Sequence, residues 1–362
     1  MSGRYPSRMS PATADVEAAV HIPTLLGKVT GGEDLSTDEA EGAFNLFMDG
    51  TATPVQMAAL LVGLRGKGLA PAEIAGGVRA LRSAMVPVPA RNPGSLVDTA
   101  GTGGGEITTF NISTAAALVA AGAGVRMAKH GNRSFTSRCG SADVLEELGV
   151  KIDLEPERMG EIIEEVGIVF MFAPLLHPAM RYVGPVRKEL GITTIMNVLG
   201  PLTNPAGARR QVVGVADPHL VSLLVMAFKE LGHVRGLVVH GSPGMDEISP
   251  SSATRVAELR DGKVTEREIT PGALGVEPQP LEGLRGGSAA ENAQVIRDVL
   301  SGKRQDAARS ATLLNAAAAI YVGGRVSSLE QGVTSAAASV DSGAAMEKLA
   351  ALKAETTRSR SS

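Results

Sequence analysis

The chain has few of the residues that build several common kinds of site. Of its 362 residues one is cysteine, Cys139, three are tyrosine and none is tryptophan. A single cysteine excludes an intrachain disulfide and a zinc site made of cysteines, and it is typical of a reducing compartment. Aromatic residues make up only 3% of the chain, which leaves few platforms on which nucleic-acid bases could stack.

The chain also has little net charge and no long apolar run. Its 35 basic residues nearly balance its 38 acidic ones, which disfavours a broadly basic nucleic-acid-binding protein. No apolar run reaches membrane-spanning length, and the polar N-terminus does not resemble a signal peptide. Hydrophobic residues make up 44%, enough to bury a sizeable core. We therefore expect a cytoplasmic protein with no nucleic-acid or membrane partner.

The first part of the chain predicts helices alone. Residues 1–14 are expected to form a disordered arm, and residues 15–90 a helical domain. Ser36 and Glu39 form a capping box, Thr53 precedes a proline at a first helical position, and Pro71 opens a third helix. The pattern predicts three short helices with no strand between them.

From residue 91 to 355 short apolar runs alternate with helical segments. Strands are expected near 96–98, 125–128, 150–154, 168–172, 212–215 and 237–239, a hairpin near 260–263, and helices alone from about 290. The alternation is typical of a parallel sheet. The predicted fold is α/β: a small N-terminal helical domain plus a large α/β domain with a mainly parallel central sheet flanked by helices. Residues 356–362 are expected to be a disordered tail.

A glycine-rich segment follows the first predicted strand. It reads Asp-Thr-Ala-Gly-Thr-Gly-Gly-Gly over 98–105, and a helix begins near Asn111. Glycines at a strand–helix junction let backbone N–H groups converge on an anion. Glu106 breaks the dinucleotide fingerprint, and no Walker A sequence is present. A phosphate site outside those two classes is favoured over a glycine-rich turn with an ordinary helix cap.

A second polar loop, residues 129–138, follows another predicted strand and carries Lys129, Arg133 and Arg138. Ligands of open α/β sheets bind at the carboxyl ends of the strands, where both loops would lie. Two such loops at one edge indicate a ligand with two phosphate groups. The alternative is a solvated basic loop.

Asp246 and Glu247 follow a third strand. Neighbouring acids facing phosphates usually hold Mg²⁺, although such a pair is often only a charged surface feature. Arg187 could clamp a substrate carboxylate or form a surface salt bridge. His130 and His177 could transfer protons or only position other groups.

Together these segments resemble the anthranilate phosphoribosyltransferase family. The matching stretches are GTGG at 101–104, FNISTA at 110–115, KHGNRS at 129–134, GSADVLEELG at 140–149 and NVLGPLTNPA at 197–206. They occur in the family's order, and the similarity covers nearly the whole chain.

The resemblance implies a fold and a reaction. The segment around 180–200 would return to the helical domain, and two copies of the chain would pair as a homodimer through that domain. The amine of anthranilate would attack C1 of 5-phosphoribosyl 1-diphosphate (PRPP), releasing diphosphate in a step of tryptophan biosynthesis. Mg²⁺ would be the cofactor.

The resemblance also implies which residues form the site. No clear acid or base is expected; Lys129, His130 and Arg187 would position the substrates. The expected anthranilate-binding residues are Gly101, Asn132 and Arg187, and the expected metal ligands are Ser113, Asp246 and Glu247. The expected PRPP-binding residues are Gly101, Thr102, Gly103, Gly104, Gly105, Thr109, Asn111, Ile112, Ser113, Thr114, Lys129, His130, Gly131, Asn132, Arg133, Ser134, Phe135, Thr136, Ser137 and Ser141.

The sequence departs from the family in the glycine loop, where Gly105-Glu106 stands in place of Asp-Gly. Two other functions share the predicted fold. One is a pyrimidine nucleoside phosphorylase, against which KHGNR and the Asp246-Glu247 pair argue. The other is a non-enzymatic relative that binds nucleic acid, for which we would expect a basic surface and the loss of Asn132 and Arg187.

Overall fold

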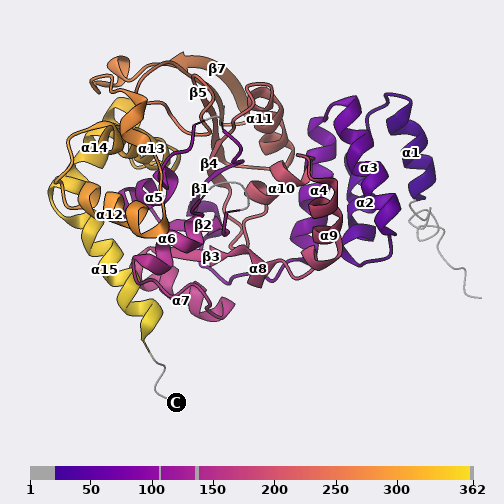
Figure 1. Ribbon diagram of the computed structural model, residues 1–362, viewed down its shortest axis with the longest axis horizontal. Helices are drawn as coiled ribbons and strands as arrows, with labels where there is room; N and C mark the ends of the chain where they lie inside the picture. The colour runs from indigo at the N-terminus through magenta and orange to yellow at the C-terminus, as the bar shows by residue number, and fades with distance from the viewer. Residues whose placement is uncertain (1–20, 106, 135–137, 359–362) are drawn as a thin grey trace, which may run out of the picture.

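The structure, a computed structural model, describes residues 21–105, 107–134 and 138–358. It has a helical part and a larger α/β part that lie side by side (Figure 1). The expected arm at 1–14 lies outside the described residues. The helical part begins with α1 (Ile22–Thr30), α2 (Thr37–Met48), α3 (Pro54–Lys67) and α4 (Pro71–Ala84). The sequence pattern missed α1, so in the described residues four α-helices precede the first strand rather than three.

The predicted helix caps are confirmed. Ser36 accepts a hydrogen bond from Glu39 N while the Glu39 carboxylate accepts from Ser36 N, and Thr53 and Gln56 make the same reciprocal pair. Each box satisfies two N–H groups that the first helical turn leaves unpaired. The caps fix where α2 and α3 begin.

Two later helices belong spatially to the helical part. In Figure 1, α9 (Met180–Leu190) lies against α2 and α3, and α10 (Met196–Leu202) lies between α4 and the sheet. Three chain segments therefore cross between the two parts. They are tied together where Val86 N donates to Leu176 O and Val88 N donates to Pro205 O.

The α/β part is built on one sheet of seven strands in the order β3-β2-β1-β4-β5-β6-β7. The first five strands are parallel: β1 (Val97–Gly101), β2 (Met127–Gly131), β3 (Ile168–Phe172), β4 (Arg210–Gly214) and β5 (Arg235–Gly241). The hairpin β6 (Thr254–Arg260) and β7 (Lys263–Ile269) is antiparallel. The predicted fold class is confirmed. The expected strand at 150–154 is wrong: this segment pairs with no strand and leads into α7 (Pro156–Val166).

Helices cover both faces of the sheet. The remaining ones are α5 (Ile112–Gly122), α6 (Ser141–Glu147), α8 (Ala173–Leu176), α11 (Leu220–Glu230), α12 (Ala289–Leu300), α13 (Ala307–Val322), α14 (Leu329–Asp341) and α15 (Ala344–Thr357), with short 3-10 turns at Pro93–Ser95, Gly272–Leu274 and Leu281–Leu284. The disordered tail expected at 356–362 is wrong for Thr356 and Thr357, because α15 runs through Thr357 and buries Thr356. Residues 359–362 lie outside the described residues. No helix in the described ranges is long and apolar enough to cross a membrane.

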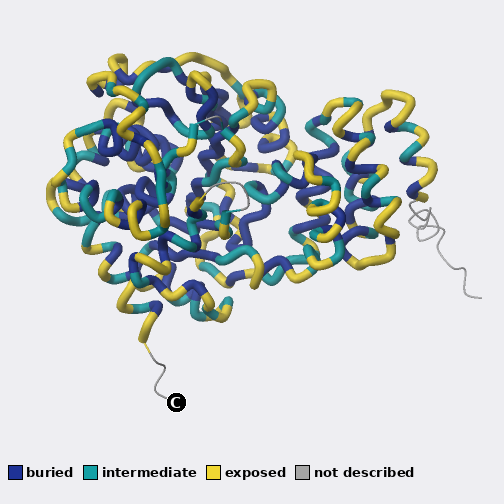
Figure 2. The backbone as a smooth tube through the Cα atoms, in the orientation of Figure 1, coloured by how far each residue is buried: buried dark blue, intermediate teal, exposed yellow. Residues whose placement is uncertain are grey.

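The side chains of β5 alternate between two hydrophobic cores. Leu237 and Val239 pack with α5 and α13 in one core, while Val238 joins a second core that also contains Phe44, Leu60 and the other buried residues of the helical domain. Figure 2 shows buried chain in both parts. Successive side chains of a strand point to opposite faces. The helical domain is therefore packed, through α4 and α11, on one face of the sheet.

Three histidines are buried in these cores. Burial lowers the pKa of His130 to about 3, of His177 to about 4 and of His233 to about 3. The ring of His233 stacks on Phe228 with centroids 4.4 Å apart, and its Nε2 lies 2.8 Å from Gln211 Oε1. All three rings are neutral in the folded protein at pH 7.

These histidines predict how stability depends on pH. Because their folded pKa values lie below the unfolded value of about 6.5, only the unfolded chain takes up protons as the pH falls from about 6.5 to 4. Stability is full above that range, and each histidine removes up to about 1.4 kcal/mol per pH unit within it. The measurement is the free energy of unfolding in urea from pH 4.5 to 7.5. We expect His233→Gln to reduce the slope by about 1.4 kcal/mol per pH unit.

The exposed His219 supplies the control. His219→Gln is expected to leave the slope of the wild-type protein unchanged. Equal slopes for His233→Gln and the wild type would show that His233 is not buried as a neutral ring.

Candidate active site

The site lies where β1, β4 and β5 end. β1 and β4 are paired in parallel, with Gly101 opposite Gly214, and the strand order reverses direction there. A crevice at such a switch point is where open α/β sheets bind ligands. The loop that follows β5 crosses the end of β4 and brings Asp246 to the end of β1.

Close packing of this loop depends on two glycines. A Cβ atom on Gly214 would lie 1.6 Å from Asp246 O, and one on Gly101 would lie 2.3 Å from Asp246 Oδ2. Only residues without a Cβ fit at these positions. The sequence marked Gly101 but missed Gly214, whose only signal was a glycine at the end of a predicted strand.

The glycine loop has fewer free backbone donors than the sequence suggested. Thr102 N donates to Gly214 O, and Gly103 N donates to Asp246 Oδ2 at 2.9 Å. Among the described residues, the N–H groups of Gly104 and Gly105 make no hydrogen bond and remain for an anion. Gly103 and Gly104 have φ values of +69° and +79°, which favour glycine.

Glu106 lies outside the described residues, but Gly105 is placed. A Cβ on Gly105 would lie 2.9 Å from Gly244 O. The aspartate typical of this position therefore requires the turn at Gly244 to shift, so the glycine here and the close approach of that turn belong together.

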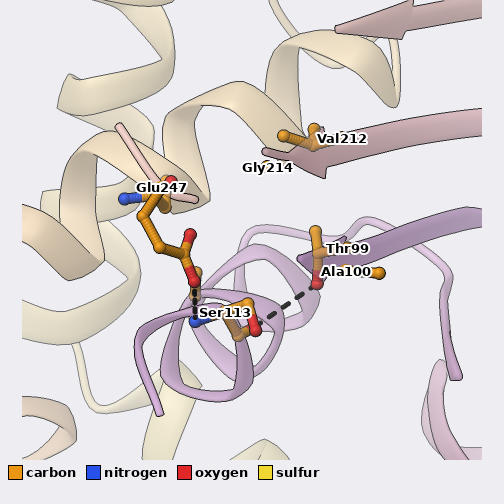
Figure 3. A pocket seen from close by; sticks show the side chains of 8 residues that line it. Thr99, Ala100, Ser113, Val212, Gly214 and Glu247 are labelled. Carbon is orange, nitrogen blue, oxygen red and sulfur yellow. Dashed lines mark hydrogen bonds between the residues drawn. The ribbon is translucent and has the colours of Figure 1, made fainter. Parts of the chain in front are cut away.

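The Glu247 carboxylate, from the loop after β5, lies at the start of α5. Its Oε1 accepts a hydrogen bond from Ser113 N at 3.1 Å (Figure 3). A carboxylate at a helix N-terminus pairs with an otherwise unpaired donor and favours the helix dipole. The place that the sequence assigned to a phosphate is therefore held, in this structure, by a side chain of the protein.

The two carboxylates lie in a setting that disfavours their charge. Burial raises the pKa of Asp246, and burial together with the neighbouring Asp246 raises the pKa of Glu247 to about 8. The Lys129 ammonium opposes the shift at Glu247. Both acids keep part of their surface exposed, so a cation could reach them.

Lys129 lies beneath the loops rather than in the open. Its side chain is buried, and its Nζ donates to Thr99 O at 2.6 Å and to Ser113 Oγ at 3.2 Å. Burial lowers the pKa of Lys129, and the charges of Asp98 and Glu247 oppose this shift. Lys129 can therefore affect a ligand by the attraction of its charge and by its hydrogen bond to the Ser113 hydroxyl.

Asp98, which the sequence analysis did not assign to the site, connects the strands beneath the two loops by hydrogen bonds. It is fully buried, and its Oδ1 accepts from His130 N at 3.1 Å while its Oδ2 accepts from Asn204 Nδ2 at 2.8 Å. Burial raises the pKa of Asp98, and Lys129 and these hydrogen bonds oppose the rise. A carboxylate inside a predicted strand, just before the glycine loop, was the signal available in the sequence.

The two buried histidines meet at the edge of the site. His130 Nε2 and His177 Nε2 lie 3.2 Å apart. Two neutral rings in contact need one N–H donor and one lone pair. They form a fixed polar contact between β2 and the segment that leads to the helical domain.

The rest of the second loop is organised by α6. Arg133 pairs with Asp143 and Glu146, each at 2.6 Å, and Ser141 Oγ donates to the backbone oxygen of Asn132. Gly131 packs against Ser141, where a Cβ would lie 2.3 Å from Oγ. The cation expected for phosphate is thus held by two carboxylates. Ser134 is described, but Phe135, Thr136 and Ser137 lie outside the described residues.

Four residues near α5 that were expected to contact PRPP are buried or bonded to other parts of the protein. Ile112 is buried in the core and its N–H donates to Phe110 O, so it presents no group to a ligand. Thr114 is also buried, with its hydroxyl unpaired among the described residues. Thr109 bridges Arg285. Asn111 is held by Asn292 and by the backbone of Cys139.

Arg187 projects from α9. It is half-buried, and burial lowers its pKa. It forms no ion pair within residues 21–105, 107–134 and 138–358. A guanidinium with no carboxylate of its own fits a clamp for a substrate carboxylate better than a structural salt bridge.

The donor set suits magnesium. No group of three or more His, Cys, Asp and Glu that could hold a metal occurs in the described part of the chain. Mg²⁺ keeps several waters and binds through one or two carboxylates plus substrate phosphates. Asp246, Glu247 and the Ser113 hydroxyl therefore fit Mg²⁺ and not zinc.

Both parts of the chain match one family. Residues 23–85 match the helical bundle domain of a glycosyl transferase family, and residues 93–346 match the a/b domain of a glycosyl transferase family. Fold and site together define a glycosyl transferase of two domains.

Comparison with named relatives shows which family within this class the chain resembles. The anthranilate phosphoribosyltransferase of Rubrobacter xylanophilus is 53% identical over 90% of this chain and 94% of its own length. The solved enzyme of the same name from Thermus thermophilus is 45% identical, with a TM-score of 0.87 over 92% of this chain and 99% of its own. The Saccharomyces cerevisiae enzyme in complex with PRPP and Mg is 26% identical, with a TM-score of 0.84 over 93% and 98% of the two chains. The chain belongs to the anthranilate phosphoribosyltransferase family, as its motifs predicted.

The packing of Gly214 yields a prediction. Gly214→Ala places a methyl group against Asp246 O, so the loop carrying both carboxylates must move. A displacement of about 1 Å can cost about a hundredfold in rate. We expect turnover to fall by about that factor while the circular dichroism spectrum stays that of the folded protein.

Gly66→Ala is the matched control, because nothing lies within 4 Å of a Cβ at that position in α3. It should keep wild-type turnover. If Gly214→Ala is folded and fully active, the loop does not need its present position for the reaction.

Proposed function

We propose that the carboxyl ends of β1, β2 and β5 carry out the reaction of the family. The 5-phosphoribosyl group of PRPP passes to the amine of anthranilate, and diphosphate leaves. The observation that carries this assignment of the site is the meeting of Asp246 and Glu247, from the loop after β5, with the glycine loop and the start of α5. Loss of anthranilate fluorescence that requires both PRPP and Mg²⁺ is the direct test.

Binding of PRPP is assigned to groups that the structure leaves unpaired. The N–H groups of Gly104 and Gly105 would donate to phosphate oxygens, since the neighbouring donors are already used. The buried charge of Lys129 would offset the charge of the phosphates from below. Asn132 would bind anthranilate beside Gly101, with Arg187 on its carboxylate.

Mg²⁺ would be held by Asp246, Glu247 and Ser113. When bound, it would neutralise charge on the leaving diphosphate. The raised pKa values of the two acids support this assignment, because a nearby cation stabilises their charged forms.

The chain supplies position rather than proton transfer. An aromatic amine is uncharged at neutral pH and needs no strong base. His130 and His177 have pKa values of about 3 and 4, so both rings are neutral at neutral pH and are weak proton acceptors. The proton that the amine loses as the N–C1 bond forms would pass to the departing diphosphate or to water. Alignment of the amine with C1 and stabilisation of the leaving group account for catalysis.

Two further properties are proposed, the oligomeric state and the location in the cell. A homodimer through the helical domain is consistent with Val55 and Val62 of α3, whose side chains are exposed. Light scattering at micromolar concentration tests it, and a monomer there would contradict it. A place in the cytoplasm stays a prediction from the sequence.

Arg187 gives a prediction about the acceptor. Arg187→Ala removes a charge-assisted contact with the carboxylate of anthranilate, worth about 1.5–3 kcal/mol. We expect the KM for anthranilate to rise about ten- to a hundredfold while that for PRPP changes far less. Steady-state kinetics with each substrate varied in turn measures both.

The exposed Lys188, next in the same helix, provides the control. Lys188→Ala should leave both KM values unchanged. Equal increases in both KM values for Arg187→Ala would mean that Arg187 supports the fold and does not hold anthranilate.

The two carboxylates give a prediction about the metal. Replacing Asp246 with Asn and Glu247 with Gln keeps their shapes and removes their charges. We expect turnover at saturating substrates and Mg²⁺ to fall at least about a hundredfold, because the leaving group is no longer neutralised. Asp261→Asn, on the exposed turn between β6 and β7, is the control for a lost acidic charge. Wild-type turnover in the double variant would disprove the metal assignment.

A further inference from the structure

A buried asparagine in α13 lies behind the metal-binding loop. Asn315 is 3% exposed and sits in an alanine-rich helix whose neighbouring residues, Ala316 to Ala319, are fully buried. A buried polar group in such surroundings costs free energy unless it is hydrogen-bonded. The sequence analysis gave this stretch no function.

Three hydrogen bonds join the Asn315 amide to two segments, the loop after β5 and the preceding turn of α13. Its Oδ1 accepts from Ile248 N at 2.9 Å, and its Nδ2 donates to Ile248 O at 3.1 Å and to Ala311 O at 2.9 Å. The amide therefore pairs with both backbone groups of the residue after Glu247. No other side chain of similar size offers one acceptor and two donors in this arrangement.

This pairing fixes the peptide between Glu247 and Ile248. The carbonyl of Glu247 is confined on the other side by Gly241, where a Cβ would lie 2.4 Å from Glu247 O. With its backbone held at both faces, Glu247 extends toward the start of α5 and accepts from Ser113 N. Asn315, Glu247 and Ser113 line one small pocket, which Figure 3 shows from close by.

We propose that Asn315 is a positioning residue for the transfer reaction, which aims the Glu247 carboxylate at Ser113 and the metal site through the Glu247–Ile248 peptide. The proposal rests on the proposed role of Glu247. It concerns a residue from α13 that touches neither substrate nor metal, 67 positions along the chain from Ile248.

The first experiment needs neither substrate nor metal. The Ser113 amide is protected from hydrogen exchange by its bond to Glu247, so a mis-aimed Glu247 exposes it. We expect Asn315→Leu, similar in size but without hydrogen-bonding groups, to speed exchange at Ser113 at least about tenfold. The matched control is Thr312→Val, which removes a buried hydrogen bond to Ala308 O one turn earlier in α13. It should leave exchange at Ser113 unchanged.

The second experiment separates positioning from stability in the full enzyme. We expect Asn315→Leu to lower kcat at least about tenfold with less than a twofold change in the KM for anthranilate. Both leucine and valine variants should lower the Tm. A normal Ser113 exchange rate and a normal kcat in Asn315→Leu, at a Tm like that of Thr312→Val, would overturn the proposal.

A double-variant cycle distinguishes this inference from the proposed function. If Asn315 acts through Glu247, adding Asn315→Leu to Glu247→Gln should cost little further rate; a full additional tenfold loss would overturn it. If Glu247→Gln alone is fully active, the proposed metal role fails first.

If Asn315→Leu does not fold, Asn315→Asp provides the test of the proposal. It keeps the acceptor for Ile248 N and loses both donors, and a wild-type kcat at pH 7.5 would contradict the proposal.

Discussion

The buried ammonium of Lys129 is the charge on which the site depends. Asp98 lies on one side of it and Glu247 on the other, while its hydrogen bonds go to Thr99 and Ser113. One cation thereby joins β1, β2, the start of α5 and the loop after β5. Removing Lys129 leaves both acids buried without their cation, which costs several kcal/mol. When all three are ionised, Asp98, Glu247 and Lys129 together carry one net negative charge, which favours the approach of a cation.

The loop after β5, which carries Asp246 and Glu247, reaches its place through backbone packing. Gly101, Gly214 and Gly241 each put a bare Cα against the segment 246–247. Asn315 then fixes the direction of the next peptide. The acids are thus held in place by packing and hydrogen bonds of the protein itself. Preorganised groups of this kind need no rearrangement at the moment of reaction.

The sequence predicted the fold class, the family and the main loops because these depend on local order. Glycines after a strand and caps before helices such as Ser36 and Thr53 are signals within a few residues. Gly214 and Asn315 gave no such signal, since their roles come from the pairing of β1 with β4 and from the packing of α13. The charge of Arg133 was visible, but its pairing with Asp143 and Glu146 was not, so it was assigned to phosphate. Val150 to Leu154 looks like a strand, yet it joins none of the seven strands of the sheet.

The contact between His130 and His177 connects the two domains beside the site. His130 follows Lys129 in β2, and His177 lies on the segment that crosses to the helical domain carrying Arg187. Burial keeps both rings neutral, so their contact is a hydrogen bond whose strength does not change across the neutral pH range. Asp98 fixes the His130 backbone from below, through the same carboxylate that faces Lys129. The position of the crossing segment is therefore tied to the phosphate side of the site by hydrogen bonds and packing. An enzyme whose catalysis rests on alignment needs such a connection, because Arg187, the proposed acceptor clamp, and the loops proposed to bind PRPP belong to different domains.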